Sequence, residues 1–361
     1  MIAGGDRAAV IRFFRWLGWP YGWAAQLRAW LYRRHWLPTY RLPRPVISVG
    51  NLTVGGTGKT PVVIFVAEWL LGKGKRVAIL SRGYRRRASQ RPLLVSDGRR
   101  VLAGPDHSGD EPYLIAQRCP QAIVAVGSDR YRLGRWVLGQ CPVDYFVLDD
   151  GFQHLHLHRD LDLLLLDVTD VAGIQAVLPV GRLREPLSAA SRASALLLTR
   201  ADNEVQAGAV WELVTRTCNR LPEPMRVLFK ADELIHVATG ELRSKARFLK
   251  KRALLFSGIG NAAAFHDLVA DLGITVVDTV VLPDHARYDR TIVDEIRERA
   301  KRVDAQLLVT TEKDAGKVIA FLDDEVPCWA VRLYTDIPGG RERLERLIMS
   351  AAAACATEAC A

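Results

Sequence analysis

Residues 46–61 read VISVGNLTVGGTGKTP, an apolar run followed by a glycine-rich turn that ends in Gly-Lys-Thr. The apolar residues Val62–Leu71 come next and have the length of a helix. Glycines let backbone N–H groups close around phosphate oxygens, and the N-terminus of a helix adds positive potential at the same point. This order predicts a strand, a phosphate-binding loop and a helix, as in an α/β nucleotide-binding domain.

The residues of this loop have distinct expected roles in holding a nucleoside triphosphate. We expect Lys59 to reach the β- and γ-phosphates and the Thr60 hydroxyl to bind Mg²⁺. The backbone of the loop is expected to contact phosphate at Gly55, Gly56, Thr57 and Gly58. Thr53 stands where the common G-x-x-x-x-G-K-[ST] motif has its first glycine, so the match is incomplete. The alternative, a chance Gly-Lys-Thr turn, is disfavoured by the strand and helix patterns on either side.

A pair of carboxylates follows another apolar run. Tyr145–Leu148 is apolar and is followed directly by Asp149-Asp150. A strand that delivers carboxylates at its C-terminal end is a common way to hold Mg²⁺ beside a phosphate-binding loop. Acid pairs often end strands without such a role. Together with the loop, however, this pair predicts a nucleoside-triphosphate site with Asp149 and Asp150 on the metal.

Short apolar runs recur through the rest of the chain and alternate with longer segments of helical spacing. The first group consists of Val46–Val49, Val77–Leu80, Ala122–Val126, Tyr145–Leu148, Leu163–Leu166 and Leu196–Thr199. The second group consists of Leu254–Phe256, Thr275–Val281, Leu307–Thr310 and Trp329–Leu333. Fully apolar strands separated by helices predict parallel sheets that are covered on both faces.

The composition narrows the class of protein. Of the 361 residues, 49% are hydrophobic and 25% are charged, which excludes a disordered, collagen-like or coiled-coil chain. The 50 Lys and Arg residues against 40 Asp and Glu give a net charge of +10, which favours acidic partners such as nucleic acid, anionic lipid or phosphorylated small molecules. The six cysteines are scattered and form no C-x-x-C pair, so a disulfide framework or a structural zinc site is disfavoured.

The N-terminal segment combines tryptophan with arginine. Five of the nine tryptophans lie in it, at Trp16, Trp19, Trp23, Trp30 and Trp36. Its longest charge-free run, Trp16–Leu27, has 12 residues, whereas a helix needs about 20 apolar residues to cross a bilayer. Trp rings and guanidinium groups together suit the headgroup layer of an anionic membrane. We therefore expect this segment to lie on a membrane surface; the alternative is a Trp-rich helix packed on the protein's own core.

These patterns divide the chain into five segments. We expect a membrane-surface helical segment at 1–38, a nucleotide-binding core domain at 39–221, a hairpin-like linker at 222–250, a smaller α/β domain at 251–350 and a disordered tail at 351–361. Within the linker, residues 227–230 and 233–237 are predicted to be short antiparallel strands, followed by a turn at Thr239-Gly240. The expected fold class is α/β, with a parallel sheet of the P-loop NTPase type and a second, smaller α/β domain.

The loop sequence also separates classes of nucleotide-binding protein. Partition ATPases carry a lysine where this chain has Val54, and GTPases carry a guanine-reading motif that Thr311–Asp314 does not reproduce in its spacing. A phosphotransferase needs only a triphosphate, a metal ion and a base aimed at a hydroxyl. A kinase is therefore the first hypothesis, and a membrane-associated P-loop ATPase or GTPase switch is the alternative.

Further motifs match a known family. They are Gly55–Pro61, Ser81-Arg82-Gly83-Tyr84, Gly109-Asp110-Glu111-Pro112, Asp149–His154 and Thr311-Glu312-Lys313-Asp314. Together they resemble the tetraacyldisaccharide 4'-kinases, the lipid A kinases of Gram-negative bacteria, over residues 45–335. The resemblance implies that ATP, with Mg²⁺, phosphorylates the 4'-hydroxyl of tetraacyldisaccharide 1-phosphate to give lipid IVA. It also implies a peripheral or monotopic protein on the cytoplasmic face of the inner membrane; we expect a monomer without a nucleic-acid partner.

The resemblance also implies roles for individual residues. Asp110 matches the base near the sugar hydroxyl and His285 matches the histidine that pairs with it, so that one of the two takes the hydroxyl proton. An alternative for Asp110 is a helix N-cap, a role compatible with that of a base, and without the resemblance His285 would be interpreted as a loop histidine. Arg82 and Arg130 match arginines suited to phosphate or transition-state charge.

Two more residues belong to this set of expected site residues. Gln153, in Asp149–His154, is expected to position the metal-bound acids or a phosphate. Glu185, in the segment Gly181–Pro186, is expected near the nucleotide or the substrate. Both assignments follow from the resemblance alone.

Overall fold

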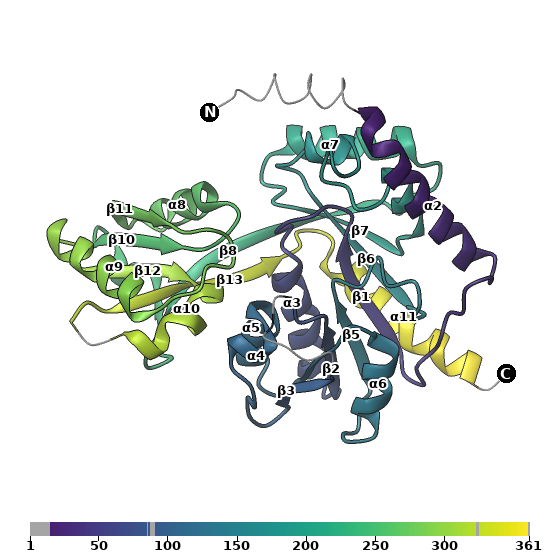
Figure 1. The fold of residues 1–361 in the computed structure, drawn as a ribbon, viewed down its shortest axis with the longest axis horizontal. Coiled ribbons are helices and arrows are strands. Elements are labelled where there is room, and N and C mark those ends of the chain that lie inside the picture. Colours follow the sequence, from purple (N-terminus) through teal and green to yellow (C-terminus); the bar gives the residue numbers. More distant parts are fainter. Residues whose placement is uncertain (1–14, 85, 87–90, 323–324, 360–361) are drawn as a thin grey trace.

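The computed structural model describes residues 15–84, 86, 91–322 and 325–359 (Figure 1). Residues 1–14 of the expected membrane segment and residues 360–361 of the expected tail lie outside this set. The first half of the chain contributes α2 (Trp19–Arg33), β1 (Val46–Asn51), α3 (Lys59–Gly72), β2 (Val77–Ser81), β3 (Leu93–Asp97), α4 (Pro105–Ser108), α5 (Asp110–Arg118), β4 (Ile123–Val126), α6 (Arg130–Leu138), β5 (Tyr145–Asp149) and β6 (Leu161–Asp167). The second half contributes β7 (Ala195–Thr199), α7 (Glu204–Thr217), β8 (Pro224–His236), β9 (Leu242–Ser244), β10 (Arg252–Ser257), α8 (Ala262–Asp271), β11 (Thr275–Val281), α9 (Arg290–Arg302), β12 (Leu307–Thr311), α10 (Glu312–Val318), β13 (Cys328–Asp336) and α11 (Arg341–Ala359).

A single continuous sheet runs through the molecule. Its strand order is β11-β10-β12-β13-β8-β7-β6-β1-β5-β2-β4-β3, with β9 paired to β8. We call the part built on β1–β7 the large lobe and the part built on β10–β12 the small lobe. The long strands β8 and β13 pair antiparallel and connect the two lobes (Figure 1). The predicted α/β fold with parallel strands is confirmed.

The large lobe has the predicted parallel sheet. Strands β1, β2, β4, β5, β6 and β7 run parallel to their neighbours. Strand β3 pairs antiparallel with β4 at the sheet edge, and the sequence analysis missed it. The reason is that Leu93–Asp97 is half-polar and irregularly alternating, as an edge strand covered on one face only can be.

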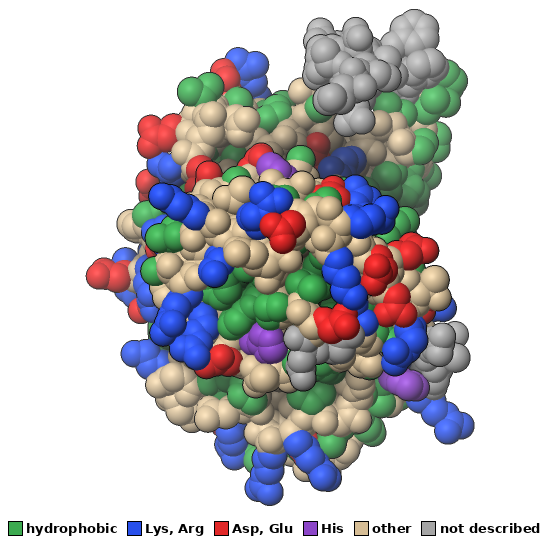
Figure 2. Space-filling view, turned by 90° about the vertical axis from the view of Figure 1, so that its left-hand side faces the viewer, with side chains coloured by type: hydrophobic (Ala, Val, Ile, Leu, Met, Phe, Trp, Pro, Cys, Tyr) green, Lys and Arg blue, Asp and Glu red, His purple; other side chains and the backbone are tan. Residues whose placement is uncertain are grey.

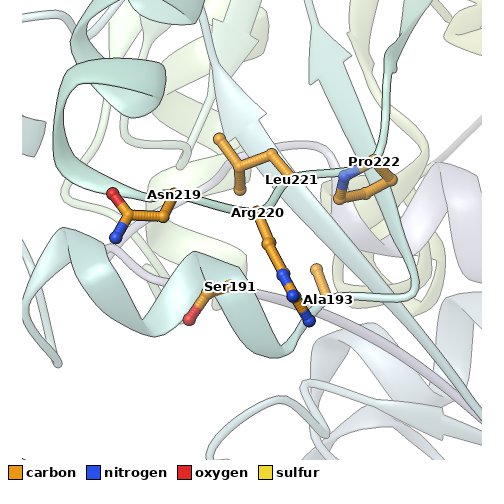
Figure 3. A pocket seen from close by; sticks show the side chains of 6 residues that line it. All are labelled: Ser191, Ala193, Asn219, Arg220, Leu221 and Pro222. Atoms are coloured by element: carbon orange, nitrogen blue, oxygen red, sulfur yellow. The ribbon is translucent and has the colours of Figure 1, made fainter.

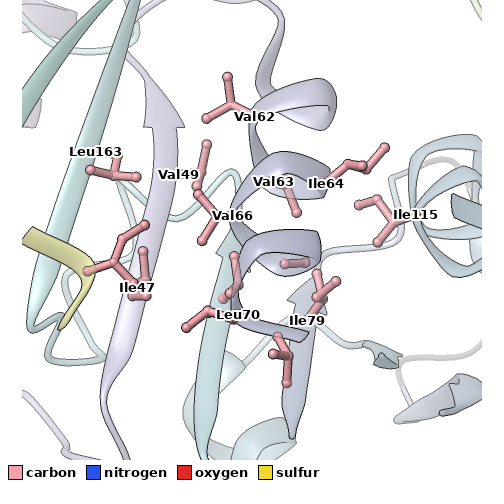
Figure 4. Close-up of a cluster of buried hydrophobic side chains, with 14 of the residues drawn as sticks. Ile47, Val49, Val62, Val63, Ile64, Val66, Leu70, Ile79, Ile115 and Leu163 are labelled. Atoms are coloured by element: carbon pink, nitrogen blue, oxygen red, sulfur yellow. The ribbon is translucent and has the colours of Figure 1, made fainter. Parts of the chain in front are cut away.

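Helix α3 fixes the phosphate-binding loop to the sheet. Its side chains Val62, Val66 and Leu70 are fully buried and pack against β1 and β2, where Ile47 and Ile79 face them (Figure 4). Complete burial of each such side chain stabilises the fold by about 1.5–3 kcal/mol. The loop is thus held between a strand and a helix that cannot shift relative to each other without opening the core.

The predicted linker contains one long strand instead of two short ones. Residues 227–230 and 233–237 were expected as separate strands, but Pro224–His236 forms the single strand β8. The intervening Ala231-Asp232 has no turn-forming glycine or proline, so the strand continues through it, with only a shift of register against β13. The turn at Thr239-Gly240 is present, and it leads into β9, which pairs antiparallel with the end of β8.

The C-terminal segment is helical, so the prediction of a disordered tail at 351–361 is wrong as far as Ala359. Leu344, Ile348, Ala351 and Cys355 are buried and recur at the spacing of one helical face. The first three of them join the core of the large lobe. The chain therefore returns to the large lobe near residue 337. The expected end of the second domain at residue 350 lies too far along the sequence.

The surface of the small lobe mixes charges of both signs. Figure 2 shows Lys and Arg side chains interspersed with acidic groups rather than gathered in one patch. Several of these groups form pairs, including Arg299 with Asp278 and Lys301 with Glu325 (2.8 Å). Exposed pairs of this kind contribute about 0–1 kcal/mol each.

Candidate active site

The site is built at the carboxyl ends of neighbouring parallel strands. Strands β1, β5, β2 and β4 lie side by side in this order, and the loops that follow them contain the predicted phosphate loop, acid pair, Arg82 and Arg130. This edge of an open α/β sheet is where such folds bind ligands. The topology thus brings together residues that are far apart in the sequence.

Asn51 connects the two ends of the phosphate-binding loop. It is the last residue of β1 and is fully buried. Its amide nitrogen donates hydrogen bonds to the hydroxyls of Thr53 (3.3 Å) and Thr57 (2.8 Å), and its amide oxygen accepts one from Lys59 Nζ (3.1 Å). Sequence reasoning missed Asn51, although an amide at the end of a buried strand, directly before a glycine-rich loop, is a usable signal.

Three side chains hold the carbonyl groups of the loop from outside. Arg182 donates to the carbonyl oxygen of Val54 from Nε (3.1 Å) and Nη2 (2.8 Å). Arg200 Nη2 donates to the carbonyl oxygen of Gly56 (3.0 Å), and the Thr199 hydroxyl donates to that of Thr57 (2.9 Å). With its carbonyls engaged in this way, such a loop can present N–H groups to a phosphate.

The glycines of the loop are needed for its shape. Gly55 and Gly58 have φ values of +110° and +82°, which residues other than glycine rarely adopt. Gly58 is also covered by the ring of Phe229 on β8, where a Cβ atom would not fit. Lys59 and Thr60 then open helix α3, as the phosphate-binding role requires.

The predicted acid pair lies directly beside Lys59. Asp150 Oδ1 is 3.6 Å from Lys59 Nζ, and both oxygens of Asp150 accept hydrogen bonds from Arg184 (2.7 and 2.8 Å). Asp149, at the end of β5, is buried and accepts a hydrogen bond from the Ser81 hydroxyl (2.8 Å). The loop lysine and the two carboxylates therefore converge, as predicted.

The two carboxylates have opposite pKa shifts. Burial, and then the negative charge of Asp150, raise the pKa of Asp149 to about 6. Burial acts on Asp150 in the same direction, but the charges of Lys59 and Arg184 outweigh it and hold the pKa of Asp150 below its ordinary value. Of the two acids, Asp150 is therefore the one whose charge the neighbouring cations stabilise.

Arg130 and Arg82 lie near these acids. Arg130 begins helix α6, is buried and donates from Nη1 to the carbonyl oxygen of Ser128 (2.8 Å). Burial lowers the pKa of Arg130, and the nearby charges of Asp150 and Asp149 oppose this shift. Arg82 is exposed and close enough to Arg130 for their charges to interact.

Gln153 and Glu185 differ in where their side chains go. Gln153 Nε2 donates to the carbonyl oxygen of Asn51 (2.9 Å), which places this residue against the base of the phosphate loop. Glu185 is buried, and its two carboxylate oxygens pair with Arg192 (2.8 and 3.1 Å). The structure therefore brings Gln153 to the loop and directs Glu185 toward Arg192.

Asp110 and His285 meet where the lobes touch. Asp110 is the first residue of α5 in the large lobe, and its Oδ2 lies 3.1 Å from Nδ1 of His285, which follows β11 in the small lobe. The N-cap of α5 is Gly109, so the alternative interpretation of Asp110 as the N-cap is wrong. His285 does lie in a loop, with a φ of +61°, a conformation that stores strain of about 1–3 kcal/mol and is typical of functional sites.

The pKa of Asp110 is lower than usual. Burial of the carboxylate acts to raise it, but the hydrogen bond from His285 and the positive charges of Lys317 and Lys313 outweigh burial. Asp110 is therefore ionised at neutral pH and able to accept a proton. The two lysines belong to α10, and sequence reasoning did not single them out as partners of Asp110.

Helix α2 presents its tryptophans to the outside. Trp19 and Trp23 on this helix, and Trp36 just after it, are 71%, 67% and 71% exposed, so the alternative in which these rings pack on the core is wrong for them. Arg28 Nη2 on the same helix donates to the carbonyl oxygen of Gln153 (3.3 Å). The helix is thus attached to the loop that carries Gln153. Among the described residues, every helix is too short or too polar to span a bilayer.

The structure has one hollow beside α2 and a second one away from this helix. One, of about 440 Å³, is lined by tryptophans of α2, by Glu185 and by residues 186–192. The other, of about 520 Å³, is lined by Ser191, Ala193, Asn219, Arg220, Leu221 and Pro222 (Figure 3). The second hollow lies at the amino ends of β7 and β8, opposite the edge that carries the phosphate loop, and so it takes no part in the site.

Comparison with known proteins agrees with this geometry. Residues 10–353 match the family described as tetraacyldisaccharide-1-P 4'-kinase. A tetraacyldisaccharide 4'-kinase of Pelobacter propionicus is 40% identical over 310 residues, covering 83% of this chain and 81% of that protein. One of Geobacter sulfurreducens is 39% identical over 313 residues, covering 87% and 86%. The crystal structure of LpxK from Aquifex aeolicus in complex with ATP superposes with a TM-score of 0.75 at 31% identity, covering 96% of this chain and 99% of that one.

Proposed function

The chain belongs to the tetraacyldisaccharide-1-P 4'-kinase family, and from this premise we infer that it is a phosphotransferase of lipid A biosynthesis. It transfers the γ-phosphoryl group of ATP to the 4'-hydroxyl of tetraacyldisaccharide 1-phosphate, which gives lipid IVA. The observation that carries this function is the convergence of Lys59 and Asp150 beside a glycine-rich loop, together with an ionised Asp110 at the lobe junction.

The residues beside the loop fit a magnesium ion. Mg²⁺ prefers oxygen ligands and is commonly held by one or two carboxylates together with the phosphates of the nucleotide. Thr60, Asp149 and Asp150 offer such oxygens, and a bound cation would favour the ionised form of Asp149, whose pKa is raised by burial and then by the charge of Asp150. We assign Mg²⁺ to these three residues, where it would neutralise charge on the phosphate oxygens.

The remaining groups act on the triphosphate and the hydroxyl. Lys59 binds the β- and γ-phosphates, and the loop from Gly55 to Gly58 surrounds them with N–H groups. Arg130, with Arg82, stabilises the negative charge of the transferring phosphoryl group. Asp110 accepts the proton of the sugar hydroxyl, since its lowered pKa keeps it ionised, while His285 holds the carboxylate in place.

The exposed tryptophans support a position of the protein on a membrane surface. Trp19 and Trp23 would lie at the acyl boundary, and Arg33 would face lipid phosphates, as in an interfacial helix. A lipid substrate and an enzyme on the same surface meet at a raised effective concentration. We propose a peripheral or monotopic enzyme on the cytoplasmic face of the inner membrane. We further propose that it acts as a monomer, because one chain supplies every group assigned above.

The function is tested with purified protein, tetraacyldisaccharide 1-phosphate in mixed micelles, Mg²⁺ and γ-labelled ATP. The expected product is the lipid with one added phosphate, identified by mass spectrometry. Asp110→Ala should abolish transfer while ATP still binds. Label that appears only as inorganic phosphate would contradict the kinase and support the ATPase alternative.

A further inference from the structure

Lys317 is a buried lysine at the junction of the lobes that none of the roles above uses. It lies on α10, one helical turn after Lys313, and its side chain is 9% exposed. Its Nζ is 3.3 Å from Asp110 Oδ2, 2.7 Å from Asp314 Oδ1 and 3.2 Å from the carbonyl oxygen of Ala286. A buried ammonium group is tolerated only when it is paired in this way, so its position is well determined.

We propose that Lys317 is a positioning residue for phosphoryl transfer: with His285 it holds Oδ2 of Asp110, so that Oδ1 is the oxygen that accepts the proton of the substrate hydroxyl. This inference rests on the proposed function, in which Asp110 is the base.

The contacts of Asp110 support this assignment. His285 Nδ1 (3.1 Å) and Lys317 Nζ (3.3 Å) both approach Oδ2, and within the described part of the chain these are the polar side-chain contacts of the carboxylate. A carboxylate oxygen that already accepts two donors has little capacity left, whereas the second oxygen keeps its lone pairs. Two donors on one oxygen also fix the rotation of the carboxylate, which orients Oδ1.

Lys317 is itself held firmly by the small lobe. Its partner Asp314 is fully buried and accepts hydrogen bonds from the backbone N–H of Gly258 (3.0 Å) and from the hydroxyl of Thr311 (2.9 Å). Thr311 is also the N-cap residue of α10, so its side chain fixes that end of the helix. The ammonium group is therefore anchored to β10 and β12, and it reaches across the junction to α5.

The other charged groups around Asp110 face different partners. Lys313 Nζ contacts Glu111 (3.2 Å), Asp284 (3.4 Å) and His285 Nε2 (3.4 Å). The ring of Tyr288 lies 5.3 Å from Lys317 Nζ, and the ring of Tyr84 lies 5.8 Å from that of His285. Of the lysines in this group, Lys317 is the one whose ammonium group reaches the carboxylate of Asp110.

The charge of Lys317 also keeps Asp110 ionised. Its positive charge is one of the influences that lower the pKa of Asp110, next to the hydrogen bond from His285. A nearby cation favours the ionised form of an aspartate and so lowers its pKa. Activity that needs ionised Asp110 rises with pH through this pKa. Removing the cation must therefore move the acid limb of the pH profile to higher pH.

The decisive variant is Lys317→Met, which keeps the length of the side chain and removes its charge. With the full-length protein, tetraacyldisaccharide 1-phosphate and Mg-ATP, we expect kcat to fall by about 10²-fold. We expect the acid limb of kcat to move to higher pH. The KM for ATP should stay unchanged. Lys317→Arg should return the acid limb to its original pH. Lys301→Met, on the exposed surface of α9, is the matched control and should behave like the parent protein.

Two results would overturn the proposal. One is a Lys317→Met variant with the parental kcat and acid limb. The other is a kcat that is lowered equally at every pH and not restored by arginine, because this indicates a structural role only. If circular dichroism shows that Lys317→Met does not fold, Lys317→Gln, a polar neutral side chain, is judged by the same two criteria.

Parallel assays separate this inference from the proposed function. An active parent protein and an inactive Asp110→Asn variant, together with unaltered Lys317→Met, would overturn the role of Lys317 alone. A parent protein that phosphorylates no lipid, or an Asp110→Asn variant with full activity, would overturn both.

Discussion

The phosphate-binding loop and the Asp110–His285 pair are constructed in opposite ways. The loop, its lysine and its helix come from one segment, residues 46–72, and the adjacent acids come from the neighbouring strand β5. Asp110 and His285 are 175 positions apart and belong to different lobes. The groups that we propose to bind ATP are thus assembled within the large lobe, whereas the groups proposed to activate the hydroxyl come together only where the two lobes meet.

The sharpest test of the ATP region is Lys59→Met. Loss of the ammonium group beside Asp150 and the phosphates should lower kcat/KM for ATP by about 10³-fold, measured as transfer of label to the lipid. Lys73→Met, at the other end of α3, is the control and should leave kcat/KM unchanged. An active Lys59→Met variant would show that the loop does not hold the triphosphate.

The junction between the lobes is tested by His285→Ala. Asp110 would lose its hydrogen bond and its orientation, so kcat should fall by about 10²-fold. ATP affinity, measured by titration calorimetry, should not change, because the ATP-binding groups lie in the large lobe. His266→Ala, an exposed histidine of α8, serves as the control. If His285→Ala lost ATP affinity by as large a factor as it lost kcat, the two regions would not be functionally distinct.

The same distinction governs what the sequence could predict. The loop, the strand before it and the acid pair could be predicted, because a local pattern specifies all of them: an apolar run, glycines, Gly-Lys-Thr and a strand ending in two acids. Asn51 and Arg182 also act within this region and both were missed, although the position of Asn51 at the end of a buried strand before the glycine-rich loop was a usable signal.

The contacts between the lobes could be identified only from the folded structure. The pairing of Asp110 with His285 was expected from the resemblance alone, and Lys317 was not expected at all. Residue spacing does not reveal that α10 packs against α5, because this contact depends on how β8 and β13 place the small lobe. The same dependence on packing explains α11, since an alanine-rich segment becomes a helix once Leu344 and Ile348 are buried on the sheet.

The acid pair predicts an unusual dependence of stability on pH in magnesium-free buffer. The folded-state pKa of Asp149 is raised to about 6 from an ordinary 3.8, so between these values the folded protein binds more protons than the unfolded chain. The free energy of unfolding should therefore fall as pH rises from about 4 to 6, by at most about 2.7 kcal/mol. Urea unfolding at several pH values measures it.

Asp149→Asn isolates this contribution. The amide cannot ionise, so the variant should lose the decline between pH 4 and 6 and be more stable than the parent at pH 7, although inactive as a kinase. A variant that keeps the decline would assign it to another group. No comparable effect is expected from Asp110, whose pKa is shifted downward.

The smallest expected effect concerns which lobe touches the membrane. Trp19 and Trp23 are exposed on α2, and this helix reaches the site through Arg28 and the carbonyl of Gln153. The small lobe instead offers the exposed basic pair Lys250 and Lys251, and the nearby ring of Phe248 is buried. Interfacial binding depends on buried apolar area as well as on charge, so α2 should dominate.

Replacing Trp19 and Trp23 by serine should weaken binding to vesicles containing anionic lipid several-fold, measured by sedimentation. It should also lower activity on vesicle-borne substrate more than activity on detergent-dispersed substrate. Replacing Lys250 and Lys251 by alanine should cause a smaller loss that disappears at high salt, because it removes only screened charge. A larger loss from the lysine pair would place the membrane contact on the small lobe and would separate it from the helix that is attached to the ATP-binding region.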